Sequence, residues 1–230
     1  MATIMRQIAI RKLTTVFWLL VLSDIIAVSC HFKISHIFLK ALLVPVLILL
    51  LSTAGKSTGK KLLLTGLIFS WLGDMFLLHD KWHQLFFIFG LVSFLITHIF
   101  YIIYFLQIKS TGRSLLLKQP WIVLIIPGYG LGLVCLLFPH LGDLMIPVII
   151  YAVIICTMLL CSFHIFYKVK KRAGYLFWMG AGAFVISDSI LAINRFYQTF
   201  AFAGGLIMLT YCLAQYLIVR GFLEEEGNKV

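Results

Sequence analysis

Charged residues are scarce in this sequence, and acidic residues are the scarcest. Only 12% of the 230 residues are charged, with 8 Asp and Glu against 19 Lys and Arg, whereas 62% are hydrophobic. The mean hydropathy is +1.07. Soluble globular domains carry about 25% charged and about 45–50% apolar residues. The composition therefore excludes an ordinary soluble domain and indicates an integral membrane protein.

Long hydrophilic stretches are also missing. Apolar runs recur from end to end, each about long enough to cross a hydrocarbon core of roughly 30 Å as a helix. No connection between them is long enough to fold as a soluble domain. We therefore expect an all-α, polytopic helix bundle that forms a single transmembrane domain, residues 1–230. The eight expected spans are approximately 13–30, 36–54, 62–79, 84–107, 118–138, 145–167, 174–196 and 200–222.

The cysteines lack any paired spacing. Five are scattered in or at the ends of apolar runs: Cys30, Cys135, Cys156, Cys161 and Cys212. An odd, scattered set gives neither a disulfide framework nor a metal motif. We expect no metal and no cofactor, and we interpret these cysteines as small packing residues.

The net charge of +11 is not arranged as a nucleic-acid surface, because no basic stripe with interleaved aromatic residues occurs. If the N-terminus is cytoplasmic, 15 of the 19 basic residues lie on the inner side, all except Lys33, Lys40, Lys81 and Arg195. Cytoplasmic loops are enriched in Lys and Arg. We therefore expect both termini in the cytoplasm, the cell (inner) membrane as location if the protein is bacterial, and the lipid bilayer rather than nucleic acid as partner. The oligomeric state stays open.

The two halves of the chain share a faint pattern. Gly66, Asp74 and Leu77 have the same spacing as Gly180, Asp188 and Leu191. In the apolar run that follows each set, a Gly-Leu pair precedes a tyrosine by the same distance. This pattern predicts a four-plus-four internal repeat in which the third and seventh spans correspond.

Ionisable residues inside the apolar runs cost about 2.5–3.5 kcal/mol each on insertion scales, and they usually face the bundle interior or a wet cavity. Six of those within or near the ends of the runs are candidates for a buried site: Asp24, Lys40, Asp74, His98, Asp188 and Arg195. At a helix rise of about 1.5 Å per residue, the three acids lie in the outer half of the bilayer, with the two bases nearer the outer surface. We expect the acids and bases to converge on one site.

Other polar residues accompany these groups at helical spacing. Residues three or four positions apart share a helix face, as in the sets Ser70 and Asp74, His98 and Tyr101, and Tyr211 and Gln215. A structural explanation stays open. In that explanation the acids pin helices together, Lys40 and Arg195 snorkel to the interface, and His98 bridges two helices.

Four stretches carry a resemblance to a known family: "GLIFSWLGDMFLL" (66–78), "FIFGLVSFLITHIFY" (87–101), "GAGAFVISDSILAINRF" (180–196) and "YCLAQYLIVRG" (211–221). Their order and spacing resemble those of the YhhN family of membrane proteins, whose characterised members are lysoplasmalogenases. The resemblance covers nearly the whole chain. It implies a hydrolase that cleaves the vinyl ether bond of a lysoplasmalogen, or of a related lysophospholipid, releasing a fatty aldehyde and glycerophosphoethanolamine or glycerophosphocholine.

The resemblance also implies roles for individual residues. The family's paired aspartates correspond to Asp74 and Asp188 as catalytic residues. The expected substrate-binding or supporting residues are Asp24, Lys40, Ser70, His98, Tyr101, Ser187, Asn194, Arg195, Tyr211 and Gln215. The family often has Lys-Pro in the second helix, whereas here Lys40 is followed by Ala41 and the proline is Pro45.

Vinyl ether hydrolysis needs a proton donor and an anion near the developing oxocarbenium ion, which two carboxylates in unequal environments supply. We expect Asp74, among apolar neighbours, to be the protonated acid and Asp188, near Arg195, to be the ionised one. Lys40 and Arg195 are expected to bind the lipid phosphate. A proton-coupled transporter or a lipid-binding protein that uses the same acids remains an alternative, although no broken-helix signature is present. A structural scaffold leaves the buried acids unexplained.

Overall fold

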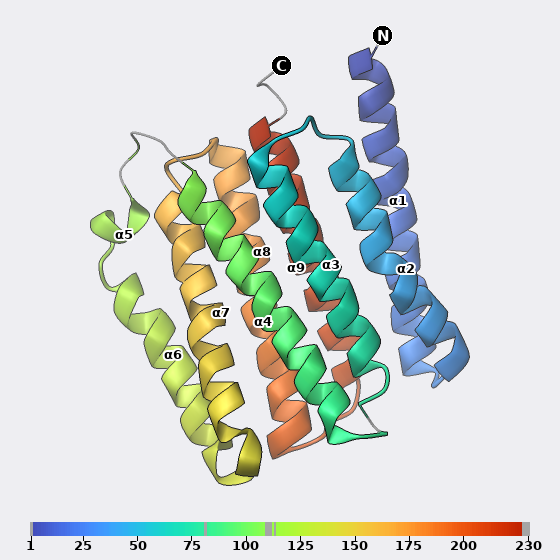
Figure 1. Cartoon of the computed structure of the whole chain (residues 1–230), viewed down its shortest axis with the longest axis vertical. Coiled ribbons are helices and arrows are strands. Elements are labelled where there is room, and N and C mark those ends of the chain that lie inside the picture. Colours follow the sequence, from blue (N-terminus) through green and yellow to red (C-terminus); the bar gives the residue numbers. More distant parts are fainter. Residues whose placement is uncertain (1, 81, 109–111, 113, 227–230) are drawn as a thin grey trace.

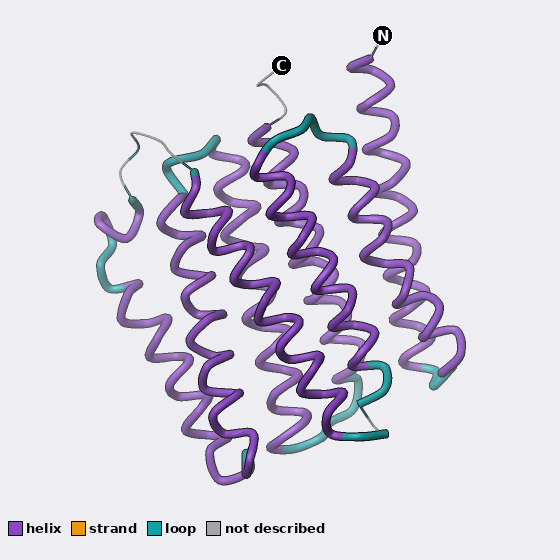
Figure 2. The backbone as a smooth tube through the Cα atoms, viewed as in Figure 1, coloured by secondary structure: helices purple, strands orange, loops and turns teal. Residues whose placement is uncertain are grey.

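The computed structural model of the chain describes residues 2–80, 82–108, 112 and 114–226. These residues form helices and connecting loops, with no strand among them (Figure 2). The elements are α1 (Ala2–Ser29), α2 (Lys33–Ser52), α3 (Thr58–Leu77), α4 (Gln84–Gln107), α5 (Leu115–Lys118), α6 (Ile122–Leu137), η1 (Phe138–His140), η2 (Gly142–Leu144), α7 (Met145–Ile165), α8 (Lys171–Ala192), η3 (Ile193–Tyr197) and α9 (Ala203–Glu226).

The long helices run alternately up and down in one bundle (Figure 1). The α1–α2 hairpin lies at one side and α6 at the other, with α3, α4, α7, α8 and α9 between them. The most extensive contacts are between α8 and α9 and between α3 and α4. The loops after α1, α3, α6 and α8 share one end of the bundle, opposite the two termini. We call this the loop end.

Among the described residues, seven helical segments are long and apolar enough to cross a membrane, in agreement with a multi-pass membrane protein. They are α1, α2, α4, α6 with η1, α7 with η2, α8 with η3, and α9. The helix α3 is as long as α2 but lies outside this set, because it carries Lys60, Lys61 and Asp74 together with three glycines and several hydroxyl side chains. An all-helical membrane bundle is thus confirmed, whereas eight spans are not.

The expected boundaries differ from the structure mainly in three places. The run expected at 13–30 is part of a longer helix, because α1 begins at Ala2. The run expected at 118–138 is divided, because Pro120 separates α5 from α6 and disfavours helical geometry at the residue before it. The run expected at 174–196 begins at Lys171 and ends in η3, a π-helical turn that carries Asn194 and Arg195. The run expected at 84–107 coincides with α4.

Glycines bring two helix pairs into close contact. A Cβ atom on Gly66 would lie 2.6 Å from the Tyr101 ring on α4, and one on Gly180 would lie 3.1 Å from the Ala214 carbonyl and 2.9 Å from Ile218 on α9. Small residues permit such backbone approach in membrane bundles. Gly66 and Gly180 therefore play the same part in the α3–α4 and α8–α9 pairs.

The Gly180 contact predicts a specific loss of stability. Gly180→Val would place two methyl groups against the α9 backbone, and we expect overpacking to cost about 1–3 kcal/mol. Gly182→Val is the matched control, because a Cβ atom at Gly182 meets nothing within 4 Å. The measurement is thermal unfolding of both variants in the same detergent. Equal unfolding temperatures would contradict the role given to Gly180.

Candidate functional site

Asp74 and Asp188 belong to two separate groups of hydrogen-bonded polar residues. The first, called the Asp74 network, contains Lys40, Ser70, Asp74, Tyr101, Tyr211 and Gln215 from α2, α3, α4 and α9. The second, called the Asp188 network, contains His98, Tyr151 and Asp188 from α4, α7 and α8. In each group, the polar side chains bond to one another inside the bundle, where burying a polar group without a partner costs free energy.

The Asp74 network centres on a buried ion pair. Lys40 Nζ lies 3.4 Å from Asp74 Oδ1, and the Tyr211 hydroxyl donates a hydrogen bond of 2.6 Å to Asp74 Oδ2. Lys40 is 8% exposed and Asp74 is 2% exposed. In this structure Lys40 is therefore engaged by a carboxylate inside the bundle.

The other hydrogen bonds of this network form a chain of donors that ends at the Asp74 carboxylate. Tyr101 donates to Gln215 Oε1 over 2.6 Å, the Gln215 amide donates to Ser70 Oγ, and Ser70 in turn contacts the Tyr211 hydroxyl. Because Tyr211 gives its proton to Asp74, Ser70 must be the donor to Tyr211. Hydrogen-bonded chains polarise one another, so every donor in the chain favours negative charge on Asp74.

Local helix geometry places these side chains. Ser70 and Asp74 are one turn apart on α3, as are Tyr211 and Gln215 on α9, as expected from the spacing. Pro45 has no N–H, which leaves the Ala41 carbonyl without its usual helical donor. The Trp71 indole N–H donates to this carbonyl over 2.9 Å. Pro45 thus frees a carbonyl group through which Trp71 links α3 to α2, beside the Lys40–Asp74 pair.

The Asp188 network is more open. The Tyr151 hydroxyl donates to Asp188 Oδ2 over 2.5 Å, and His98 Nε2 lies 3.0 Å from the Tyr151 oxygen and 3.3 Å from Asp188 Oδ2. Because Tyr151 gives its proton to Asp188, Nε2 carries the proton that His98 donates. The Asp188 side chain is 17% exposed, whereas His98 is fully buried. Tyr151 could not be predicted from the sequence, since a tyrosine in an apolar run is common.

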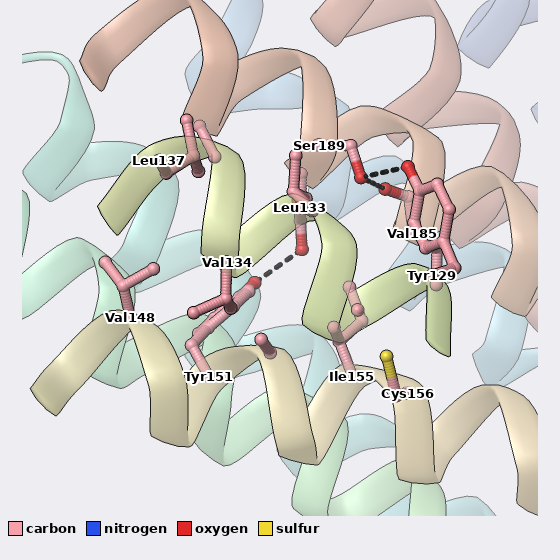
Figure 3. A pocket seen from close by; sticks show the side chains of 14 residues that line it. Tyr129, Leu133, Val134, Leu137, Val148, Tyr151, Ile155, Cys156, Val185 and Ser189 are labelled. Carbon is pink, nitrogen blue, oxygen red and sulfur yellow. Dashed lines mark hydrogen bonds between the residues drawn. The ribbon is translucent and has the colours of Figure 1, made fainter. Parts of the chain in front are cut away.

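Two cavities meet at Asp188. The first cavity lies between α6, α7 and α8 and is partly open, with a volume of about 440 Å³ that includes this open space (Figure 3). The second cavity lies between α4, α7 and α8 and reaches Leu77 of α3, with a volume of about 430 Å³ that likewise includes open space. Both are lined almost wholly by apolar side chains, and both include Val148, Tyr151, Asp188 and Ala192. Asp74 lines neither of these two cavities.

Aromatic rings lie between the two networks. The Phe184 ring contacts His98 at a centroid distance of 5.1 Å and Tyr211 at 6.0 Å, and the Phe94 ring packs on Tyr211 at 5.7 Å. No hydrogen bond or ion pair found within the described residues joins Asp74 to Asp188. The acids and bases were expected to converge on one site. In the structure, Asp74 and Asp188 instead belong to two neighbouring sites.

The other predicted residues lie around these networks. Arg195 was expected beside Asp188, but it pairs with Asp80 at 3.3 Å and lies over the Phe87 ring. Asp80, in the loop after α3, gave no signal in the sequence. Asp24 is fully buried and bonds to His36 at 2.7 Å.

Two supporting residues bond to the backbone. Ser187 donates to the Ile207 carbonyl over 3.2 Å, and Asn194 Oδ1 accepts from the Phe200 N–H over 3.3 Å. Ser187 therefore ties α8 to α9, and Asn194 anchors the loop that follows η3. Neither bond reaches Asp74 or Asp188.

Comparison with known proteins matches the model of the YhhN family over residues 35–222. The chain belongs to the YhhN family. It is 30% identical to a protein named lysoplasmalogenase from Mycobacterium bovis over 174 residues, which cover 71% of this chain and 60% of that protein. It is 31% identical to lysoplasmalogenase TMEM86B of Mus musculus, over 76% of this chain and 68% of that protein.

A human relative is similar to the same extent. Lysoplasmalogenase TMEM86A of Homo sapiens is 30% identical over 69% of this chain and 64% of that protein. The chain thus spans about 60% of the length of the mycobacterial relative that it matches. No solved structure matches this member of the YhhN family significantly.

Proposed function

We propose that this YhhN family member is a lysoplasmalogenase-like hydrolase, with a lysoplasmalogen or a related lysophospholipid as substrate. The products are a fatty aldehyde and glycerophosphoethanolamine or glycerophosphocholine. The observation that carries the proposal is the position of Asp188, a carboxyl group where two apolar cavities meet inside a membrane bundle. The names of the relatives support the substrate class.

Asp188 is the proposed proton donor. Its described hydrogen bonds use Oδ2, which leaves Oδ1 to hold the proton and give it to the vinyl carbon remote from the ether oxygen. Water adds to the resulting oxocarbenium ion and returns a proton to Asp188. The hemiacetal then passes its hydroxyl proton to the glycerol oxygen and separates into aldehyde and alcohol. Tyr151, positioned by His98, stabilises the carboxylate form through its hydrogen bond.

Asp74 is the proposed anion. Lys40 and the chain of donors through Tyr211 favour its ionised form. Its negative charge, beyond the Phe94 and Phe184 rings, stabilises the oxocarbenium ion through a medium of low dielectric constant. These roles are the reverse of those expected from the sequence, because the structure places a cation beside Asp74 and pairs Arg195 with Asp80.

Arg195 is the proposed ligand of the lipid phosphate. It lies at the loop end over Phe87, which lines the second cavity. Loss of a hydrogen bond to a charged group costs about 1.5–3 kcal/mol, so Arg195→Gln should raise KM by about 10–100-fold with kcat nearly unchanged. Arg172→Gln, which breaks a surface pair with Glu224 at the opposite end, is the matched control. A KM that is unchanged in Arg195→Gln would remove this role.

The proposed topology is a single transmembrane domain with eight spans and both termini in the cytoplasm. Its location is the inner membrane if the source is a bacterium. The position of α3 between α2 and α4 supports an eighth span (Figure 1). The matching roles of Gly66 and Gly180 support the four-plus-four repeat. The bilayer supplies the substrate, and nucleic acid has no part in the proposal.

A transporter is the less favoured function. A proton path would need polar groups that continue from Asp74 to the far side of the bundle. The described chain from Asp74 instead ends at Tyr101, which is fully buried. A closed chain of this kind fits a fixed electrostatic role better than proton conduction.

The test of the hydrolase proposal is aldehyde release by purified protein in detergent. We expect turnover of a 1-alkenyl lysophospholipid and none of its 1-alkyl analogue, which has no double bond to protonate. No turnover of the alkenyl lipid by well-folded protein would overturn the proposal.

A further inference from the structure

The two cavities overlap at Asp188, and the first reaches farther from the loop end than the second. In the first cavity, Val185 lies one turn before Asp188 on α8, and Cys156 lies five residues beyond Tyr151 on α7, about 7.5 Å of helix rise. Val185 and Cys156 therefore both lie farther from the loop end than Asp188 and Tyr151 do. The first cavity, whose lining also includes Val148 and Ala192 on the loop-end side, therefore has an inner part that reaches past Asp188 toward the middle of the bundle.

The second cavity leads toward the loop end. Its lining includes Phe196 in η3 and Phe87 in the first turn of α4, both of which lie close to the ends of their helices. The Arg195 guanidinium lies 4.9 Å from the centre of the Phe87 ring. A molecule in this cavity would therefore have a cation beside its outer end.

This arrangement matches the two parts of a single-chain lipid. The apolar chain of such a lipid points into the membrane and its phosphate lies at the surface, with the ether linkage between them. We propose that the first cavity binds the alkenyl chain, that the second cavity holds the glycerol backbone with the phosphate toward Arg195, and that Cys156 and Gly130 set the preferred chain length. This inference rests on the proposed function for the position of the scissile bond.

The inner part of the first cavity is defined by a close contact. Gly130 of α6 faces Cys156 of α7, and a Cβ atom on Gly130 would lie 2.7 Å from Cys156 Sγ. Tyr129 spans the same cavity, since its hydroxyl donates to Ser189 Oγ over 2.8 Å (Figure 3). A larger side chain at Cys156 would therefore shorten the space open to a chain without touching Asp188.

The experiment measures binding of two lipids that cannot be hydrolysed, the octadecyl and dodecyl 1-alkyl ethers of glycerophosphoethanolamine. Each buried methylene strengthens binding by about fourfold. We expect Cys156→Phe to weaken octadecyl binding by about tenfold or more and to leave dodecyl binding nearly unchanged. Cys135→Phe is the matched control, because Cys135 is exposed on α6 and lines neither cavity.

A milder variant covers the case in which Cys156→Phe does not fold. Ala152→Leu also fills the first cavity, and Val153→Leu, exposed at the next position on α7, is its control. Selective loss of octadecyl binding in either variant supports the inference, even if wild-type protein fails to hydrolyse the alkenyl lipid. Hydrolysis with an unchanged preference in the folded variants would overturn the inference and leave the proposed function standing.

Discussion

Asp188→Asn should lower kcat for aldehyde release by about 10²–10⁴-fold, the usual contribution of general acid–base catalysis. Asparagine keeps the size of the side chain and still accepts the Tyr151 hydrogen bond, so the fold and lipid binding should persist. It cannot deliver a carboxyl proton to carbon. Rates are measured at saturating substrate, and binding of the 1-alkyl ether reports whether the cavities remain intact.

The control for this variant is Asp143→Asn. Asp143 is exposed in η2 and lines neither cavity, so its replacement should leave kcat unchanged. Activity of Asp188→Asn within a few-fold of wild type would show that another group protonates the substrate, and the proposed role of Asp188 would be lost.

Lys40→Met should destabilise the protein by about 3–5 kcal/mol, because it leaves the Asp74 carboxylate buried without its cation. The double variant Lys40→Met with Asp74→Asn removes both charges and should regain most of this stability. It should nevertheless stay inactive, because it lacks the anion that we propose to stabilise the oxocarbenium ion. Thermal unfolding and kcat are measured for wild type, for the single variants Lys40→Met and Asp74→Asn, and for the double variant.

Lys33→Met provides the control on the same helix. Lys33 is exposed at the start of α2, so we expect little change in stability or rate. A double variant that regains both stability and activity would show that Asp74 serves only to hold α2 and α3 together.

Much of the helical architecture follows from the sequence, because hydropathy and length alone define a membrane helix. The bounds of α4 were predicted in full, whereas the division before α6 depends on one proline. Hydropathy alone does not identify α3 as a membrane span, because charged, hydroxyl and glycine residues lower the hydropathy of this helix, which carries Asp74. A helix that faces partner helices needs less apolar surface than one that faces lipid.

The candidate site was predicted in part. The cost of burying a charge identified Asp74 and Asp188, and helical spacing identified the pairs of residues that share a face. Spacing could not show that His98 and Tyr101, three residues apart, belong to different networks on either side of Phe184. Partners distant in sequence, such as Asp80 for Arg195, depend on how the loops close, and no local pattern reports that.

The most direct test of the account is hydrolysis of a 1-alkenyl lysophospholipid in D₂O, with the aldehyde reduced at once and analysed by mass spectrometry. Protonation at carbon by a carboxyl group that exchanges with solvent places one deuterium on the carbon next to the carbonyl. We predict a singly deuterated product from wild type and almost none from Asp188→Asn. Aldehyde released without deuterium at that carbon would contradict the mechanism.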